Sequence, residues 1–503
     1  MAKPSLLLSF FIIIIFFFFL LCFSCPRFSC PQHQKQALLQ FKSSILATGS
    51  SLDSSTFGLP SWNLNSSCCA WERVTCKSPS NSTHSRVVII GLNLSYLFRE
   101  GMLPSSTILE PLFRIRSFML LDISNNNIQG RIPAVGFSNL TKLVHLENDN
   151  LNESIPPQLF HLQHLQYLDL SNNFLHGSLS PEVASLKNLR IVKLSYNHFL
   201  NGKILEEIGN LTKLKHLSLQ GNKFSGGIPA SVLNLKELEV SDLSRNDLSM
   251  EILAGIGNSS NIFCLSLRNN KLTGGIPWWM EKLRKLEILD LENNSLTGEI
   301  PSWLFDLNSL KDLFLGGNHL SWNNSLKIAP KSMLHQLSMK SCGLAGEIPH
   351  WISTLKRLVS LVLSENQLQG EFPQWLVEMK LLGEILSDDE LTGSLSTCLF
   401  SQSRLLMLAL SRNHFFGELP EKSGDAKELR ILMLAGNNLA GLIPPSISQI
   451  PELLWLDLFG NKLSGNTFPA FDPQGRLTYI DFSSSEFSGE LPTTFSREIK
   501  ILA

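Results

Sequence analysis

A phrase of 16 residues returns along most of this chain at a nearly constant step. Its clearest copy is LEILDLENNSLTGEIP at residues 286–301, which follows the pattern L-x-x-L-x-L-x-x-N-x-L-x-G-x-I-P. From residue 173 to residue 485 the copies lie almost always 24 residues apart, with one-residue slips near 200 and 389. A fixed period of this length predicts a leucine-rich-repeat solenoid, in which each repeat forms one coil of the stack.

The spacing within the phrase predicts how one coil is built. Leu289 and Leu291 are two residues apart, so in a short strand both side chains face the core and Asp290 faces outward. Asn294 is expected to be buried, because its amide can satisfy backbone groups that lose their partners where the chain turns. The fold class that we predict is an α/β solenoid, a leucine-rich-repeat horseshoe with parallel strands on its concave face.

The Asn position can be followed through about 17 repeats. It is Asn at residues 126, 173, 197, 222, 246, 270, 294, 318, 366, 413, 437 and 461, and five further copies carry Leu97, Asp149, Cys342, Asp389 or Ser485. At these positions, Asp, Ser and Cys side chains are expected to make some of the backbone hydrogen bonds that Asn makes. We assign residues 87–503 to the repeats, with an open C-terminal end.

The N-terminus carries a targeting segment. Lys3 precedes the uncharged run LLLSFFIIIIFFFFLLCFS, and Ser24 ends an acceptable cleavage site, so residues 1–24 are predicted to be a signal peptide. The run is long, and a retained signal anchor is the alternative. Both a cleaved signal peptide and a retained signal anchor would direct the chain into the secretory pathway.

Residues 25–86 are predicted to form a separate cap over the first coil, because the end of a solenoid must cover its apolar edge. The stretch QALLQFKSSI at residues 36–45 has apolar residues close to helical spacing. Four cysteines, Cys30, Cys68, Cys69 and Cys76, lie in this segment, and pairing is expected in an oxidising compartment. Neighbouring Cys68 and Cys69 are poorly placed to bridge each other, so each should pair with another cysteine.

Composition and motifs argue against several functions. A formal net charge of -1 argues against a nucleic-acid-binding protein, which usually has a basic field. The sequence has no nucleophile elbow, phosphate loop or metalloprotease motif. The pairs His161/His164 and Asp388/Asp389 have no further partners at a useful spacing. We therefore expect no enzyme, no catalytic residue, no metal site and no cofactor.

The outward positions of the strands change character along the array. They are polar in the middle and apolar near the C-terminal end, where they are Met407, Ile431, Met433, Trp455, Phe459 and Tyr479. An exposed apolar patch of this size usually marks a contact site, so these six residues are the predicted ligand- or partner-binding residues. The alternative is that the outermost row is often apolar in such repeats, as Ile191 and Ile288 show.

The chain also contains nine sequons for N-glycosylation, which support glycosylation at several positions of a secreted chain. They lie at Asn65, Asn81, Asn93, Asn139, Asn152, Asn210, Asn258, Asn293 and Asn323.

Two parts of the sequence carry a family resemblance. The cap segment SWNLNSSCCAWERVTC (61–76) and the recurring phrase G-x-I-P, as at residues 226–229, resemble the plant extracellular leucine-rich-repeat proteins, and above all plant receptor-like proteins. The resemblance implies a plant-type cap in which Cys30 pairs with Cys68 and Cys69 with Cys76. Arg73 stands where the family's cap motif usually has Gly.

The resemblance also implies a function. Receptor-like proteins are single-pass cell-surface receptors that bind a peptide, microbial or cell-wall-derived ligand and signal through co-receptor leucine-rich-repeat kinases in defence or development. The expected location is the outer face of the plasma membrane, or the apoplast for the chain as written. Alternatives are a secreted inhibitor of polygalacturonases and an ectodomain fragment of a receptor kinase. The apolar side chains of the last coil, with no cap after them, lead us to expect that the chain as written is a truncated gene product or a splice form.

Overall fold

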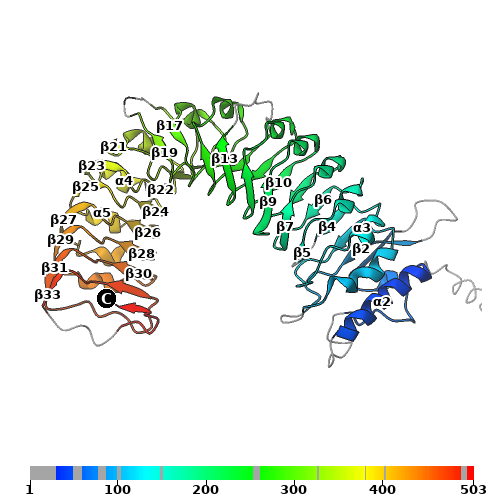
Figure 1. Cartoon of the computed structure of the whole chain (residues 1–503). Helices are drawn as coiled ribbons and strands as arrows, with labels where there is room; N and C mark the ends of the chain where they lie inside the picture. Colours follow the sequence, from blue (N-terminus) through cyan, green and yellow to red (C-terminus); the bar gives the residue numbers. More distant parts are fainter. Residues whose placement is uncertain are drawn as a thin grey trace, which may run out of the picture. The chain divides into compact units, whose positions relative to one another are not determined.

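The computed structural model describes residues 30–48, 59–77, 87–98, 103–147, 151–252, 261–323, 325, 328–379, 381–401, 404–488 and 495–502. The chain forms two compact units, residues 1–200 and 201–503. Each unit is a stack of coils in which a short strand, a turn and an outer segment alternate (Figure 1). The predicted signal peptide, residues 1–24, lies outside the described residues.

One coil of the second unit shows the common plan. Strand β16 (Ile288–Asp290) is followed by β17 (Thr297–Glu299) and then by the 3₁₀ segment η9 (Ser302–Asp306). Leu289 and Leu291 are fully buried, whereas Asp290 is half-buried on the other face of β16. The predicted alternation of core and surface positions is therefore confirmed.

The inner strands of each unit pair in parallel, each with the strand of the next coil. In the first unit they are β2 (Val88–Asn93), β3 (Leu120–Asp122), β4 (His145–Glu147), β6 (Tyr167–Asp169) and β8 (Ile191–Lys193). In the second unit they are β10 (His216–Ser218), β12 (Val240–Asp242), β14 (Cys264–Ser266), β16, β18 (Asp312–Phe314), β20 (Gln336–Ser338), β22 (Ser360–Val362), β24 (Gly383–Ile385), β26 (Met407–Ala409), β28 (Ile431–Met433), β30 (Trp455–Asp457), β32 (Tyr479–Asp481) and β34 (Ile501–Leu502).

A second set of parallel strands follows the Asn position of the coils. In the first unit it comprises β5 (Asn152–Glu153) and β7 (Phe174–Ser178), and the chain passes to the second unit within β9 (Phe199–Lys203). In the second unit it comprises β11 (Lys223–Gly226), β13 (Asp247–Glu251), β15 (Lys271–Thr273), β17, β19 (His319–Ser321), β21 (Ala345–Gly346), β23 (Gln367–Glu371), β25 (Glu390–Gly393), β27 (His414–Glu418), β29 (Asn438–Gly441), β31 (Lys462–Gly465) and β33 (Glu486–Phe487).

The outer side of most coils is a single 3₁₀ turn rather than an α-helix. These segments are η3 (Ser106–Arg114), η4 (Pro157–His161), η5 (Pro181–Ser185), η6 (Glu206–Asn210), η7 (Ala230–Asn234), η8 (Trp278–Lys282), η9, η10 (His350–Thr354), η11 (Ser423–Asp425) and η12 (Pro445–Gln449). Short α-helices replace them at α3 (Ala134–Ser138), α4 (Gln374–Glu378) and α5 (Thr397–Phe400). Pieces of about five residues are too short for an α-helix to gain much from its later hydrogen bonds.

The geometry of the turn, which repeats from coil to coil, comes from the buried Asn side chains. Asn294 accepts a hydrogen bond from the backbone N–H of Leu272 (3.1 Å), and its amide donates to the carbonyl oxygens of Leu267 and Leu291 (3.0 Å each). One side chain thus forms hydrogen bonds with backbone groups of its own coil and of the preceding coil. The same bonds recur at Asn246, Asn270 and Asn318, so the predicted Asn ladder is confirmed.

The substitutes for Asn differ in how well they work. Asp389 accepts hydrogen bonds from the backbone N–H groups of Asn366 and Leu368 (3.1 Å each), so it replaces the acceptor of Asn as predicted. The Cys342 thiol lies 3.4 Å from the carbonyl oxygen of Lys340. Ser485 makes none of these hydrogen bonds, because its buried hydroxyl has no hydrogen-bond partner among the described residues. A Ser side chain is shorter than Asn and carries no second polar group.

We expect Asn294→Ala to destabilise the second unit by about 1–3 kcal/mol, because the buried N–H of Leu272 loses its acceptor and the carbonyl oxygens of Leu267 and Leu291 each lose one of two Asn donors. Hydrogen exchange would show the loss first at the amide of Leu272, whose acceptor disappears. Asn308→Ala, an exposed residue after η9, is the control and should change neither stability nor exchange. Unchanged protection at Leu272 in the variant would contradict this role of the ladder.

The cap in the first unit consists of helix α2 (Gln32–Thr48), the turn η2 (Cys68–Ala70) and strand β1 (Val74–Lys77), which pairs antiparallel with β2. Leu38, Phe41 and Ile45 of α2 are fully buried, as the spacing predicted. Cys30 is bonded to Cys68 and Cys69 to Cys76, with Cα–Cα separations of 5.6 and 5.5 Å. The pairing implied by the resemblance is confirmed.

Arg73 occupies the position where the cap motif usually has Gly. Its φ angle is 67°, in the left-handed region that Gly adopts most readily. The Arg73 guanidinium donates to the carbonyl oxygen of Ser95 (2.8 Å), which ties the cap to the first coil. The side chain thus provides a contact that Gly could not make.

Candidate functional site

The six predicted contact residues lie together on the exposed face of four consecutive inner strands of the second unit. Met407, Ile431, Trp455 and Tyr479 are register partners in β26, β28, β30 and β32, and the first three of these strands follow one another in Figure 1. Met433 lies in the next row, and Phe459 follows β30. We call these six residues the apolar surface. Phe459 is 45% exposed and the others are half-buried.

The most ordered feature of the apolar surface is a pair of stacked rings. Trp455 and Tyr479 lie face to face, with ring centroids 3.7 Å apart and an angle of 6° between the planes. The buried indole N–H of Trp455 has no hydrogen-bond partner among the described residues. Each of the two rings thus covers one face of the other. The sequence predicted where the two residues lie, but it did not predict that they stack.

Two carboxylates that the sequence reasoning missed lie on the same strands as this ring pair. Asp457 and Asp481 are register partners in β30 and β32, two residues after Trp455 and Tyr479. Burial, reinforced by the charge of Asp481, raises the pKa of Asp457 above its ordinary value of 3.8. The signal in the sequence is the repeated aromatic-x-Asp triplet, WLD at 455–457 and YID at 479–481.

Elsewhere on the same face, several charged groups form ion pairs within the protein. Arg268 lies 2.6 Å from Glu292, Lys340 2.8 Å from Glu365, and Arg412 donates to both carboxylate oxygens of Asp388. Asp290, in the middle of the array, has its pKa raised to about 6 by burial. Part of the polar middle is therefore paired internally, whereas Asp242 and Asp290 there, like Asp457 and Asp481, form no ion pair with a Lys or Arg side chain among the described residues.

One acidic residue lies in the core. Glu384 of β24 occupies the position of the buried Leu361 and Leu408 in the adjacent strands, and it is 2% exposed. Its Oε2 atom has no hydrogen-bond partner in the described residues, and burial raises the pKa of the carboxyl to about 8. A Glu at a core Leu position of the repeat is a signal that the sequence reasoning did not use.

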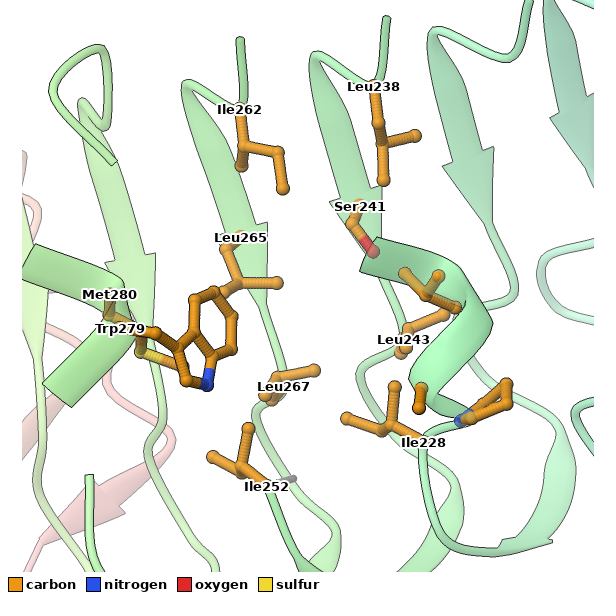
Figure 2. A pocket seen from close by; sticks show the side chains of 13 residues that line it. Ile228, Leu238, Ser241, Leu243, Ile252, Ile262, Leu265, Leu267, Trp279 and Met280 are labelled. Atoms are coloured by element: carbon orange, nitrogen blue, oxygen red, sulfur yellow. The ribbon is translucent and has the colours of Figure 1, made fainter. Parts of the chain in front are cut away.

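A small cavity of about 50 Å³ lies in the core of the second unit, between the coils of β12 and β14. Figure 2 shows its lining, in which Trp279 of η8 and Leu265 of β14 face the same space as Leu243. None of the lining residues is titratable, so the cavity holds no group for acid–base chemistry.

The structure places seven of the nine predicted glycosylation sites. Asn65, Asn93, Asn152, Asn210 and Asn293 are exposed, and Asn139 and Asn323 are half-buried. Asn81 and Asn258 lie outside the described residues. The amide of Asn93 donates to Asp122 (2.8 Å) and that of Asn293 to Asn269 (2.9 Å), so a glycan at either site would replace an existing hydrogen bond. Glycosylation at all nine stays a prediction.

Parallel strands on an Asn ladder, with a disulfide-bonded cap before the first coil, define a leucine-rich-repeat solenoid. Family models agree: a leucine-rich-repeat N-terminal domain matches residues 31–77, a leucine-rich-repeat region matches 174–315, and a further leucine-rich repeat matches 428–450. The chain thus contains leucine-rich repeats and a leucine-rich-repeat N-terminal domain, and the curated proteins that it resembles include plant receptor-like proteins.

Receptor-like protein 46 of Arabidopsis thaliana is 45% identical over 122 residues, which are 24% of this chain and 14% of that protein. Receptor-like protein 9DC1 of Solanum pimpinellifolium is 29% identical over 238 residues, 44% of this chain and 26% of that protein. The matched segments thus span a small part of the length of these relatives.

Solved structures of plant receptor ectodomains resemble the fold. The ectodomain of the Arabidopsis thaliana receptor kinase GASSHO1/SCHENGEN3, in complex with CASPARIAN STRIP INTEGRITY FACTOR 2, has a TM-score of 0.74 and 32% identity, covering 91% of this chain and 59% of that chain. The Arabidopsis receptor kinase HAESA, in complex with the peptide hormone IDA and the co-receptor SERK1, has a TM-score of 0.68 and 27% identity, covering 92% and 83%. In the part of this chain that the structure describes, no helix has the length and apolar character needed to cross a membrane.

Proposed function

We propose that this chain is the ligand-recognition part of a plant receptor-like protein and that it binds a peptide on the apolar surface. The observation that carries the proposal is the row of apolar side chains with its stacked Trp455 and Tyr479 and the exposed Phe459. Large aromatic residues dominate the energy of protein interfaces, and a contiguous exposed apolar patch usually marks a contact.

The comparisons support this class of ligand and partner. The structural relatives named above are receptor ectodomains, and one complex contains a peptide hormone together with a co-receptor. By analogy, the chain acts at the cell surface, through binding rather than catalysis, and passes the signal to co-receptor leucine-rich-repeat kinases. Residues 25–86 serve as its cap and 87–503 as its recognition array.

The proposal can be tested with a displayed library of random peptides selected against the purified chain. We expect binders whose affinity falls at least tenfold in the double variant Trp455→Ala/Phe459→Ala, because both rings leave the contact surface. The variant should remain folded and lose about 1–2 kcal/mol, mainly through the stack with Tyr479.

Phe416→Ala is the matched control. Phe416 is 54% exposed on β27, which belongs to the second set of strands. The control should bind the selected peptides as the native chain does. Peptides that bind both variants equally well, or a library that yields no binder, would contradict a peptide site on the apolar surface.

A further inference from the structure

A hollow with a strong excess of basic side chains lies at the N-terminal ends of the inner strands from β18 to β26 in the second unit. Its volume is about 610 Å³, which is in the range of ligand-binding clefts. The titratable side chains of its lining are Asp312, His335, Lys356, Arg357 and Arg404. Three cations against one carboxylate leave an excess of two positive charges, without counting the imidazole. We call His335, Lys356, Arg357 and Arg404 the basic hollow.

The spacing of these side chains is set by the stacking of the coils. The backbone N–H of Val359 donates to the carbonyl oxygen of His335 (2.8 Å), and the same bond recurs at the next two steps of the stack. The coils of Arg357 and Arg404 contain β22 and β26, which lie on either side of β24 in Figure 1. The two Arg residues are therefore about 10 Å apart at the backbone.

Basic residues at the ends of other inner strands have acidic partners within the chain. Lys311, directly before β18, lies 2.6 Å from Glu287, and Arg476, shortly before β32, lies 2.5 Å from Glu452. In both pairs the carboxylate comes from the same place in the preceding coil. The repeat thus offers a regular way to neutralise a cation at this edge.

The basic hollow does not use this arrangement. The residue one repeat before Arg357 is Met333, which has no charge. Neither Arg357 nor Arg404 forms an ion pair within the described part of the chain, and the Lys356 ammonium donates to the uncharged carbonyl oxygen of Ser353 (2.8 Å). All three cations are exposed. A concave surface with like charges and no internal counter-ions attracts anions.

The basic hollow adjoins the apolar surface. Arg404 precedes Met407 of the apolar surface by three residues in the same coil, so β26 borders both. The hollow extends from there across the strands to β20, a distance of about 14 Å, which an extended peptide covers with about four residues. A peptide on the apolar surface can therefore continue into the basic hollow.

The chemistry of the basic hollow matches carboxylates. A guanidinium presents several N–H donors in one plane and can hold a carboxylate through two parallel hydrogen bonds. Two guanidinium groups on separate coils suit two acidic side chains better than one compact anion, because about 10 Å of backbone lies between them.

We propose that the basic hollow binds acidic side chains of the peptide ligand, next to the apolar segment that lies on the apolar surface. This inference rests on the proposed function, because it assigns the chemistry of a second segment of the same ligand.

The test uses the peptides selected against the native chain and their synthetic copies. Selected binders should carry Asp or Glu residues beside their apolar residues. Replacing these by Asn or Gln should weaken binding about tenfold at low ionic strength by isothermal calorimetry, and so should the double variant Arg357→Gln/Arg404→Gln. In the double variant, the same replacement in the peptide should have little further effect. Amidation of the peptide C-terminus should change the affinity little, because the contact is assigned to side chains.

Arg284→Gln/Lys285→Gln is the matched control. Lys285 has the same place in the coil of β16 as Arg357 has in the coil of β22, and its ammonium donates to Asn261 (2.8 Å). This control changes the net charge by the same amount as the double variant of the basic hollow. It should bind the acidic peptides as the native chain does.

The outcomes separate the two proposals. Peptides that depend on Trp455 and Phe459 but tolerate the loss of their acidic residues, or of Arg357 and Arg404, would overturn the acidic contact and leave the peptide surface intact. An equal loss of affinity in the control, or a loss caused by amidation alone, would also overturn it. Peptides indifferent to Trp455 and Phe459 would overturn the proposed function itself.

Discussion

Glu384→Leu is expected to stabilise the second unit, and the gain should grow as the pH rises from about 4.5 to about 8. Glu384 lies in the core between Leu361 and Leu408, and burial raises its pKa from 4.5 to about 8. The folded protein therefore holds a proton that the unfolded chain releases in this range. The free energy of unfolding should fall with rising pH through that window and level off above it.

The expected size of this effect is large for a single side chain. A pKa raised from 4.5 to about 8 corresponds to a loss on the order of 5 kcal/mol between the acidic and the basic limit. Leu has no charge to bury and restores the apolar row, so its variant should lack this loss. Comparing variant and native chain at each pH removes the contribution of the other titrating groups.

Thermal melting with hydrogen exchange around β24 provides the measurement. Glu384→Gln keeps the shape of the side chain and never ionises. Its stability relative to the native chain should rise with pH by the same amount as that of Glu384→Leu, from a smaller starting gain at acidic pH. Glu371→Gln is the surface control, because Glu371 is exposed on β23. A stability difference between Glu384→Leu and the native chain that does not change from pH 5 to pH 8 would mean that Glu384 is not protonated in the folded state.

The second large effect concerns the cap. Replacing Cys30 and Cys68 together by Ala should destabilise the first unit by about 4 kcal/mol, because the bond joins residues that are 38 apart in sequence. The corresponding change at Cys69 and Cys76, which are 7 apart, should cost about 2–3 kcal/mol, because it frees a shorter loop in the unfolded chain.

Both pairs can be compared in one experiment by urea unfolding monitored through hydrogen exchange of α2 and β2. Exchange in β16 of the second unit, which contains neither bond, is the internal control. If the shorter loop proves the more costly to lose, the stabilisation does not come from restricting the unfolded chain. Full protection of α2 in the Cys30/Cys68 variant would show that helix packing alone holds the cap.

Much of the fold could be predicted from the sequence because the determining signals are local and repeated. The alternation around Leu289 and Leu291 places core and surface without any knowledge of distant contacts. The Asn ladder follows from the hydrogen-bonding capacity of one side chain at one step of the period. The position of the apolar surface follows from the same alternation, because register partners are residues one repeat apart.

The remaining features depend on contacts that no spacing encodes. The outer segments are 3₁₀ in most coils, but α3 and α4 are α-helices of the same length as η9, so the number of residues alone does not choose between the two. Trp455 and Tyr479 stack because of the side-chain torsions that their neighbours allow, and a pattern of residue types contains no torsions. The sequence by itself determined the coil, its ladder, its cap, the outward rows of the strands and, through the repeat register, the core position of Glu384. Only the tertiary structure showed that Trp455 and Tyr479 stack and that Asp457 and Asp481 form no ion pair among the described residues, because side-chain contacts and charge balance depend on every neighbour in space.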